Sequence, residues 1–270
     1  MCNKINLRCY LPFVVSQVKI ALAYRMAFFV RILSNLFTVM ITWYLWNAIY
    51  RSFGRATMNG FTFQEMATYV IVSFFVTVML APAQADEVSY AIADGSVAVS
   101  LLRPLDFCGL YLAQSLGGFL VNTLVFSAPF LILFGKMGKL ILPTPQRLLL
   151  FLASVGLGYL IMFYFSFCFS MLVFYTTYFF GINMAKAVTI RLCSGALIPL
   201  SFFPDAIEKM FSFLPFSSMV YTPVMIWLGK LEGTALCTQF VIQLFWVLIF
   251  FVLSKFCWRA AVRRITVLGG

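Results

Sequence analysis

Long runs of uncharged, mostly apolar residues dominate the sequence, and polar positions lie in short segments between them. A transmembrane helix needs about 20 such residues. We therefore predict six spans, at roughly 32–50, 66–85, 107–135, 148–173, 185–202 and 234–256. We expect a turn at 175–183, where Gly181 and Asn183 disfavour a continuous helix. Lys186 and Arg191 should then extend from the start of the fifth span toward the interface.

A further apolar run, 210–229, is long enough to span but contains Pro215 and Pro223, which each remove a backbone donor. Six spans place both termini on one side of the membrane, whereas seven would separate them. Both ends are basic, so the positive-inside rule places both in the cytoplasm. The basic residues concerned are Lys4, Arg8, Lys19, Arg25, Lys255, Arg259, Arg263 and Arg264. We therefore expect the segment at about 204–229 to be re-entrant on the outer side.

The start of this outer segment has a recognisable helix pattern. Pro204 should end the fifth helix, and Asp205 should cap a short helix at about 206–213, with Glu208 three residues on in capping-box spacing. A second short helix at about 219–228 should follow the proline break.

The N-terminal residues 1–25 lack the clean apolar core of a secretory signal. Apolar Phe13, Val14 and Val18 recur at helical spacing, with Lys19 set apart from them. This pattern predicts an amphipathic helix in the cytoplasmic interface, and a disordered basic tail is the alternative. We divide the chain into this helix, a transmembrane domain at 26–256 and a basic cytoplasmic tail at 257–270.

The inner segment at about 84–106 holds half of the acidic residues of the chain. Gly95 suits the residue after a helix end, and Pro104 should force an extended exit. We predict a helix, a tight turn and a second short helix in the cytosol, where a partner could bind; an ordinary solvated loop is the alternative. The candidate residues are Asp86, Glu87, Asp94, Gly95, Arg103, Pro104 and Asp106.

Composition narrows the possible functions. Of 270 residues, 63% are hydrophobic and 10% charged, against roughly 25% charged in soluble domains, which excludes a soluble enzyme. The chain has no histidine and no P-loop, and no residue set predicts a catalytic or metal site. No charge lies at the centre of a predicted span, which argues against an ion relay. The net charge of +11 is spread over helix ends, so we expect no nucleic-acid binding.

Two motifs resemble those of ABC-2-type transporter permeases, the membrane subunits of bacterial ABC exporters. The first is Gly95 followed by Leu-Leu-Arg-Pro-Leu-Asp at 101–106. The second is Gly-Ala-Leu-Ile-Pro-Leu-Ser-Phe-Phe-Pro at 195–204, followed by Leu-Pro-Phe at 214–216, Pro223 and Gly229. The similarity extends over the whole chain.

The resemblance implies an all-α, type V exporter-like fold. The N-terminal helix would be a connector, and the inner segment a coupling loop that docks on a separate ATPase subunit. ATP and Mg²⁺ would bind that subunit, with no cofactor on this chain. A second permease chain, identical or homologous, would complete the export path in a bacterial cell membrane. The residues implied for the outer re-entrant gate are Pro199, Pro204, Asp205, Glu208, Pro215, Pro223 and Gly229. A membrane scaffold or immunity-type protein that does not transport is the alternative.

Overall fold

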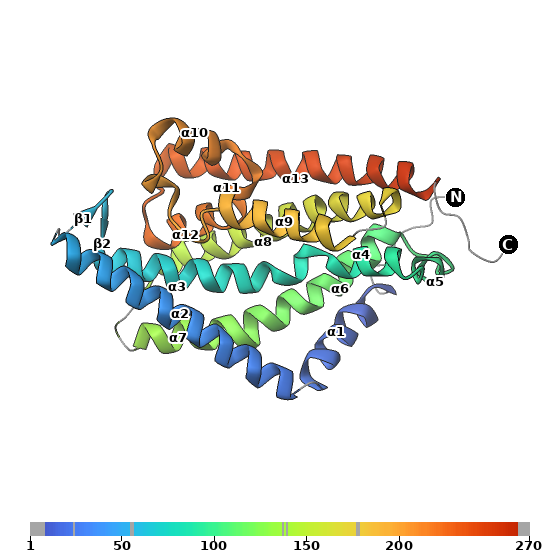
Figure 1. Cartoon of the computed structure of the whole chain (residues 1–270), viewed down its shortest axis with the longest axis horizontal. Coiled ribbons are helices and arrows are strands. Elements are labelled where there is room, and N and C mark those ends of the chain that lie inside the picture. The colour runs from blue at the N-terminus through green and yellow to red at the C-terminus, as the bar shows by residue number, and fades with distance from the viewer. Residues whose placement is uncertain are drawn as a thin grey trace.

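Long helices that run side by side make up most of the molecule (Figure 1). The computed structural model describes residues 9–23, 25–54, 57–136, 138, 140–176 and 179–263. The long helices are α2 (Arg25–Phe53), α3 (Phe63–Leu80), α6 (Phe107–Val121), α7 (Ala128–Lys136), α8 (Pro145–Met171), α9 (Phe179–Cys193) and α13 (Gly233–Val262). A π-helical turn at Asn122–Ser127 joins α6 to α7 into one continuous element.

Four helical stretches of the described residues are long and apolar enough to cross a membrane. They are Phe63–Ala93, Phe107–Lys136, Pro145–Tyr175 and Gly233–Val262. Apolar helices therefore occupy the second, third, fourth and sixth predicted spans. The first predicted span lies within α2, which has 29 residues, and the count of six crossings stays a prediction.

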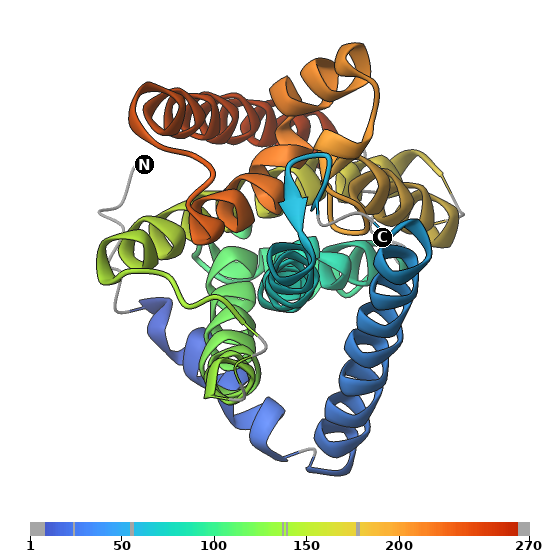
Figure 2. The same ribbon diagram turned by 90° about the vertical axis from the view of Figure 1, so that its left-hand side faces the viewer.

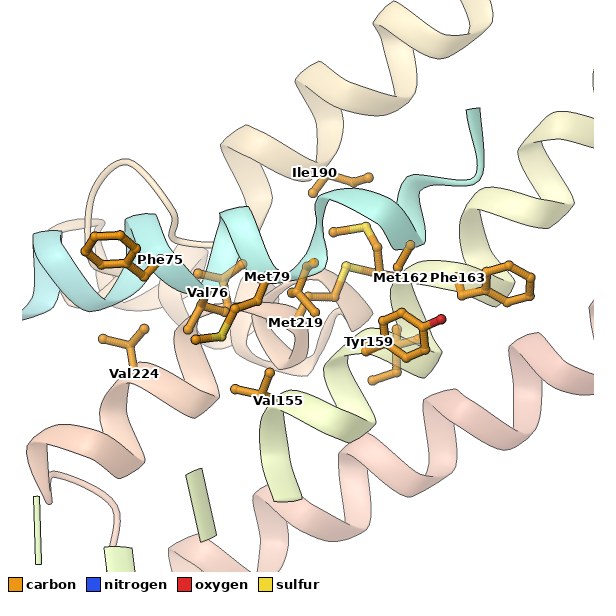
Figure 3. Packing of buried hydrophobic residues seen from close by; sticks show 14 of the residues in the cluster. Phe75, Val76, Met79, Val155, Tyr159, Met162, Phe163, Ile190, Met219 and Val224 are labelled. Atoms are coloured by element: carbon orange, nitrogen blue, oxygen red, sulfur yellow. The ribbon is translucent and has the colours of Figure 1, made fainter. Parts of the chain in front are cut away.

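Helix α3 is the centre of the bundle, with the other helices arranged around it (Figure 2). Its side chains Phe75, Val76 and Met79 are buried. Figure 3 shows Val76 and Met79 close to Met219 and to Val155 of α8, while the Phe75 ring stacks on Phe130 of α7. The largest part of the apolar core thus lies between α3, α8 and the predicted re-entrant segment.

The fifth predicted span is misplaced along the sequence. Helix α9 begins at Phe179 and ends at Cys193, rather than running over 185–202. Gly181 and Asn183 lie inside it, and the turn comes earlier, at Leu172–Tyr175. Asn183 is tolerated in the helix because its amide oxygen accepts a hydrogen bond from Ser89. Lys186 consequently lies at the middle of the helix and Arg191 in its last turn, rather than both at its start.

Small elements close the two ends of the bundle (Figure 1). A hairpin of β1 (Thr57–Met58) and β2 (Phe61–Thr62) lies at one end. Its two-residue turn, Asn59–Gly60, has positive φ at both positions, as a type I′ turn requires. At the other end lie α4 (Asp86–Ala93), α5 (Val97–Leu101) and the N-terminal helix α1 (Leu11–Ala23). We call these the hairpin end and the α4–α5 end.

Candidate functional site

The start of α4 is held to α9 by a buried cation. The Lys186 side chain is 1% exposed, and its ammonium donates to the Gln84 carbonyl at 2.6 Å and to Asp86 Oδ1 at 2.7 Å. Ala85, between those two acceptors, has a left-handed backbone with φ +53°. A non-glycine residue in that conformation costs free energy, so surrounding contacts must hold the chain there.

A second set of polar contacts joins α4 to both neighbouring helices. The Ser89 hydroxyl lies 2.9 Å from Ser170 Oγ of α8 and 3.2 Å from Asn183 Oδ1 of α9. Ser170 Oγ also lies 3.3 Å from the Ala85 carbonyl. Buried polar groups that satisfy one another fix a single arrangement of the helices that carry them.

A tight turn separates α4 from α5, as predicted. Gly95 has φ +79°, where a side chain would be strained. The Ser96 backbone N–H donates to Asp94 Oδ1 at 2.9 Å, and this hydrogen bond lowers the pKa of the Asp94 carboxyl. Glu87 of α4 is exposed and has no ion-pair partner among the described residues.

The exit from α5 is a bend rather than the extended segment predicted from Pro104. The Leu105 N–H donates to the Arg103 carbonyl at 2.8 Å, so the chain reverses around the proline. The Arg103 guanidinium then lies 5.3 Å from the centroid of the Phe13 ring in α1. This cation–π contact ties the exit to the N-terminal helix.

Asp106 joins three elements at the α4–α5 end. Its carboxylate caps α6 by accepting from the Gly109 N–H at 2.8 Å, and its backbone N–H donates to the Tyr10 hydroxyl at 3.3 Å. Lys255 of α13 lies 3.4 Å from both carboxylate oxygens. The next residue, Phe107, stacks on Trp258 with ring centroids 4.1 Å apart.

Large apolar side chains are exposed on α4, α5 and the turn that follows, and Leu102 is 85% exposed. This group, which we call the α4–α5 tip, is Tyr90, Val99, Leu101 and Leu102. Charged residues lie within and directly after this stretch of the sequence, at Asp94 and Arg103. A surface that combines exposed apolar groups with a charged rim is typical of a protein-binding surface.

The predicted re-entrant segment folds into three short helices, α10 (Asp205–Phe213), α11 (Pro215–Met219) and α12 (Tyr221–Leu228). The predicted capping box at Asp205 and Glu208 is wrong: Pro204 occupies the cap position, and no side chain caps the helix. Thr62 and Glu65 do form a capping box, at the start of α3. Nor does Pro204 end the fifth helix, because a turn and a 3₁₀ segment (Leu200–Phe202) separate them.

The other residues predicted for this segment lie at its breaks. Pro199 precedes the 3₁₀ segment, and Pro215 begins α11, where the missing N–H costs nothing. Pro223 is buried in the first turn of α12. Gly229 ends that helix with φ +70°, and a Cβ there would clash with the guanidinium of Arg147.

The segment reaches the middle of α8. A Cβ added at Gly158, near the centre of that helix, would lie 2.9 Å from the Met219 carbonyl oxygen. The end of α11 therefore packs directly on the α8 backbone. From the hairpin end, the chain enters to about half the length of a long helix and returns through α12.

One buried glutamine satisfies the irregular backbone at this depth. Gln243 of α13 is fully buried, and its Nε2 donates to the Ser218 carbonyl and to Ser154 Oγ, both at 2.8 Å. Without these donors, the Ser218 carbonyl would face apolar surroundings at considerable cost. Non-helical backbone is tolerated at membrane depth where protein covers it in this way.

Two further side chains of α13 hold the flanking parts of the segment. The Trp246 indole donates to the Phe213 carbonyl at 2.9 Å, and the Thr222 hydroxyl donates to Gln239 Oε1 at 3.2 Å. Positions 239, 243 and 246 repeat at helical spacing and share one face of α13. We call this face the α13 polar stripe.

A cleft of about 280 Å³ opens between α2, α3 and α9. Thr38, Val39 and Thr42 line it from α2. The other lining residues are Val70, Phe74, Thr77, Gln84, Met162, Ala187, Ile190, Arg191, Ser194, Ala196, Leu197 and Val220. Gln84 joins the cleft to the contact of Lys186 with α4.

The structure thus gathers the two predicted sets of residues at different places. The inner set lies at the α4–α5 end, and the outer set lies between the hairpin end and the middle of α8. Sequence reasoning missed the buried Lys186 contact and the α13 polar stripe. The two glutamines four residues apart in an otherwise apolar run could have indicated the stripe.

The chain matches the family model described as "ABC-2 family transporter protein" over residues 15–269. It therefore belongs to the ABC-2 family of transporter membrane proteins. Together with the long apolar helices, this makes it a multi-pass membrane protein and a permease component of an ABC transporter. No curated protein sequence matches the chain.

Proposed function

We propose that this chain is the permease subunit of an ABC exporter that works with a separate ATPase subunit. The observation that carries the proposal is the α4–α5 tip, which exposes large apolar side chains on a rigidly held element in a member of the ABC-2 family. ATP and Mg²⁺ would bind the partner ATPase. A second permease chain, identical or homologous, would complete the transport path.

The proposed topology has six crossings, by α2, α3, α6–α7, α8, α9 and α13, with both termini and the α4–α5 end in the cytoplasm. Helix α9 has 15 residues, about 22 Å at 1.5 Å per residue, and the turn after it would complete the crossing. In this orientation α10–α12 enter from the outside, where they would close the outer end of the path. The cleft between α2, α3 and α9 would form half of that path.

The contact of Lys186 with α4 supports a coupling role for the α4–α5 element. It attaches the element that would touch the ATPase directly to α9, one of the helices that line the cleft. A rigid attachment through a buried ion pair would transmit a displacement of α4 to α9. Packed interfaces move between discrete arrangements instead of deforming gradually.

The decisive experiment is co-purification of the chain with a candidate ATPase from the same cell, followed by ATP hydrolysis assays in lipid. We expect hydrolysis by the complex and none by the chain alone. Leu102→Asp should abolish co-purification, whereas Leu142→Asp, which changes an exposed leucine in the loop between α7 and α8, outside the tip and outside the crossings, should leave the ATPase contact intact. Stable expression without any ATPase partner would favour the scaffold or immunity-type alternative.

A further inference from the structure

Arg191, in the last turn of α9, lines the cleft between α2, α3 and α9 and lies at membrane depth in the proposed topology. It is twelve residues from the start of α9, about 18 Å along the helix. The α2 residues across the cleft, Thr38 and Thr42, are at least eleven residues from either end of that helix, or about 16 Å. The cleft is therefore close to the middle of the bundle, far from both interfaces.

No acidic side chain of this chain neutralises Arg191. All eight acidic residues of the sequence lie in the part of the chain that the structure describes. Four of them form ion pairs, each with a different basic residue: Glu232 with Arg147, Asp86 with Lys186, Glu65 with Lys230, and Asp106 with Lys255. A charged side chain inside a bilayer normally pairs or marks the path of a ligand.

The rest of the lining suits the body of an amphiphile. Nine of its fifteen residues are apolar, and Arg191 alone carries charge. The hydroxyls of Thr38, Thr42 and Thr77 donate to backbone carbonyls four residues earlier at 2.8–2.9 Å. Their oxygens therefore remain as acceptors, and the Arg191 guanidinium supplies the charged donors. A guanidinium can bind both oxygens of an acidic group in parallel hydrogen bonds.

We propose that Arg191 makes this cleft a binding site for amphiphiles that carry a carboxylate, sulfonate or phosphate group. This names a substrate class for the proposed function and rests on it. The apolar lining holds the body of the ligand, and Arg191 holds its acidic group. The anion could come from a bilayer lipid headgroup or from another acidic cargo.

The test uses the full chain in phosphatidylcholine nanodiscs, with and without its ATPase partner and without nucleotide. The probes are dansylaminoundecanoic acid and its neutral methyl ester, and binding is measured by dansyl fluorescence. We expect wild type to prefer the acid, Arg191→Gln to weaken acid binding by about tenfold, and Arg191→Lys to weaken it less. Arg51→Gln, the same change at an exposed position outside the cleft, should bind the acid like wild type.

Binding of the neutral ester by Arg191→Gln shows whether that variant is folded. If Arg191→Gln does not bind the ester, the proposal is judged from the preference of wild type for the acid over the ester. Equal affinity of wild type for acid and ester, or normal acid binding by a folded Arg191→Gln, would overturn the proposal. Added phosphatidylglycerol that competes with the acid would identify a lipid headgroup as the anion, and lack of competition would identify another acidic cargo. Because the binding assay needs no hydrolysis, failure of the proposed function would show separately, as a lack of coupled ATP hydrolysis.

Discussion

The ion pair between Lys186 and Asp86 should respond unequally to loss of its two members. The Lys186 side chain is 1% exposed and that of Asp86 is 43% exposed. Asp86→Asn removes the negative charge and leaves the buried ammonium with neutral acceptors alone, which should cost about 3 kcal/mol. Lys186→Met leaves a carboxylate that water can reach, and the cost should be about 1 kcal/mol.

Thermal unfolding in detergent measures the difference. For a chain of this size, each kcal/mol lowers the unfolding midpoint by about 2–4 °C, so Asp86→Asn should lower it by about 6–12 °C and Lys186→Met by about 2–4 °C. In the double variant Lys186→Met/Asp86→Asn no buried charge is left unpaired, and its midpoint should lie near that of Lys186→Met. Lys209→Met, at an exposed lysine outside any ion pair, is the control and should leave the midpoint unchanged.

Two results would refute this reasoning. One is a loss for Lys186→Met that equals or exceeds the loss for Asp86→Asn, since burial would then not govern the cost. The other is additivity of the two single losses in the double variant, since residues in contact should show a coupling free energy. If α4 also couples the ATPase, Lys186→Met should keep ATPase binding but reduce substrate-stimulated hydrolysis.

The remaining predictions concern the outer segment. Gly158→Ala should destabilise the fold by about 2 kcal/mol because its Cβ would meet the last carbonyl of α11 at 2.9 Å, while Gly156→Ala, with nothing within 4 Å, should be neutral or stabilising in the same unfolding assay. Gln243→Leu should cost about 2–3 kcal/mol in that assay by leaving buried acceptors unsatisfied; an unchanged midpoint would contradict the role of the stripe. In a cysteine-free background, Asp205→Cys and Lys230→Cys should both react with a membrane-impermeant thiol reagent from outside; labelling from opposite sides would establish a seventh span.

The sequence predicted the elements whose causes are local. Gly95 and Gly229 were expected at helix ends, and both have the left-handed backbone that favours glycine. The run at 210–229 was expected to break at Pro215, and α11 begins there. Runs of apolar residues likewise located the long helices, because a bilayer requires their length.

The errors arose where a tertiary contact decides the outcome. Gly181 and Asn183 are poor helix formers, yet Asn183 accepts from Ser89 of α4, 94 residues earlier, and α9 starts before both. The spacing of Asp205 and Glu208 fits a capping box, but Pro204 occupies the cap position. Lys186 was expected to reach the interface, whereas its acceptors come from a segment about 100 residues earlier. Pairings of this kind leave no periodic trace in a sequence.

Helix α9 connects the parts of the molecule that a transport cycle would have to coordinate. In its first half and at its middle, Asn183 and Lys186 hold α4. Just beyond its end, the Ser194 carbonyl accepts from the Tyr221 N–H at 3.1 Å, at the break between α11 and α12. Between these contacts α9 lines the cleft. A helix is stiff along its axis because every turn is closed by hydrogen bonds, so a displacement of α4 must either move the break at α12 or rupture a buried contact. Because the ion pair is buried, breaking it costs more free energy than moving the break at α12. The Lys186 and Asp86 variants therefore test the coupling most directly.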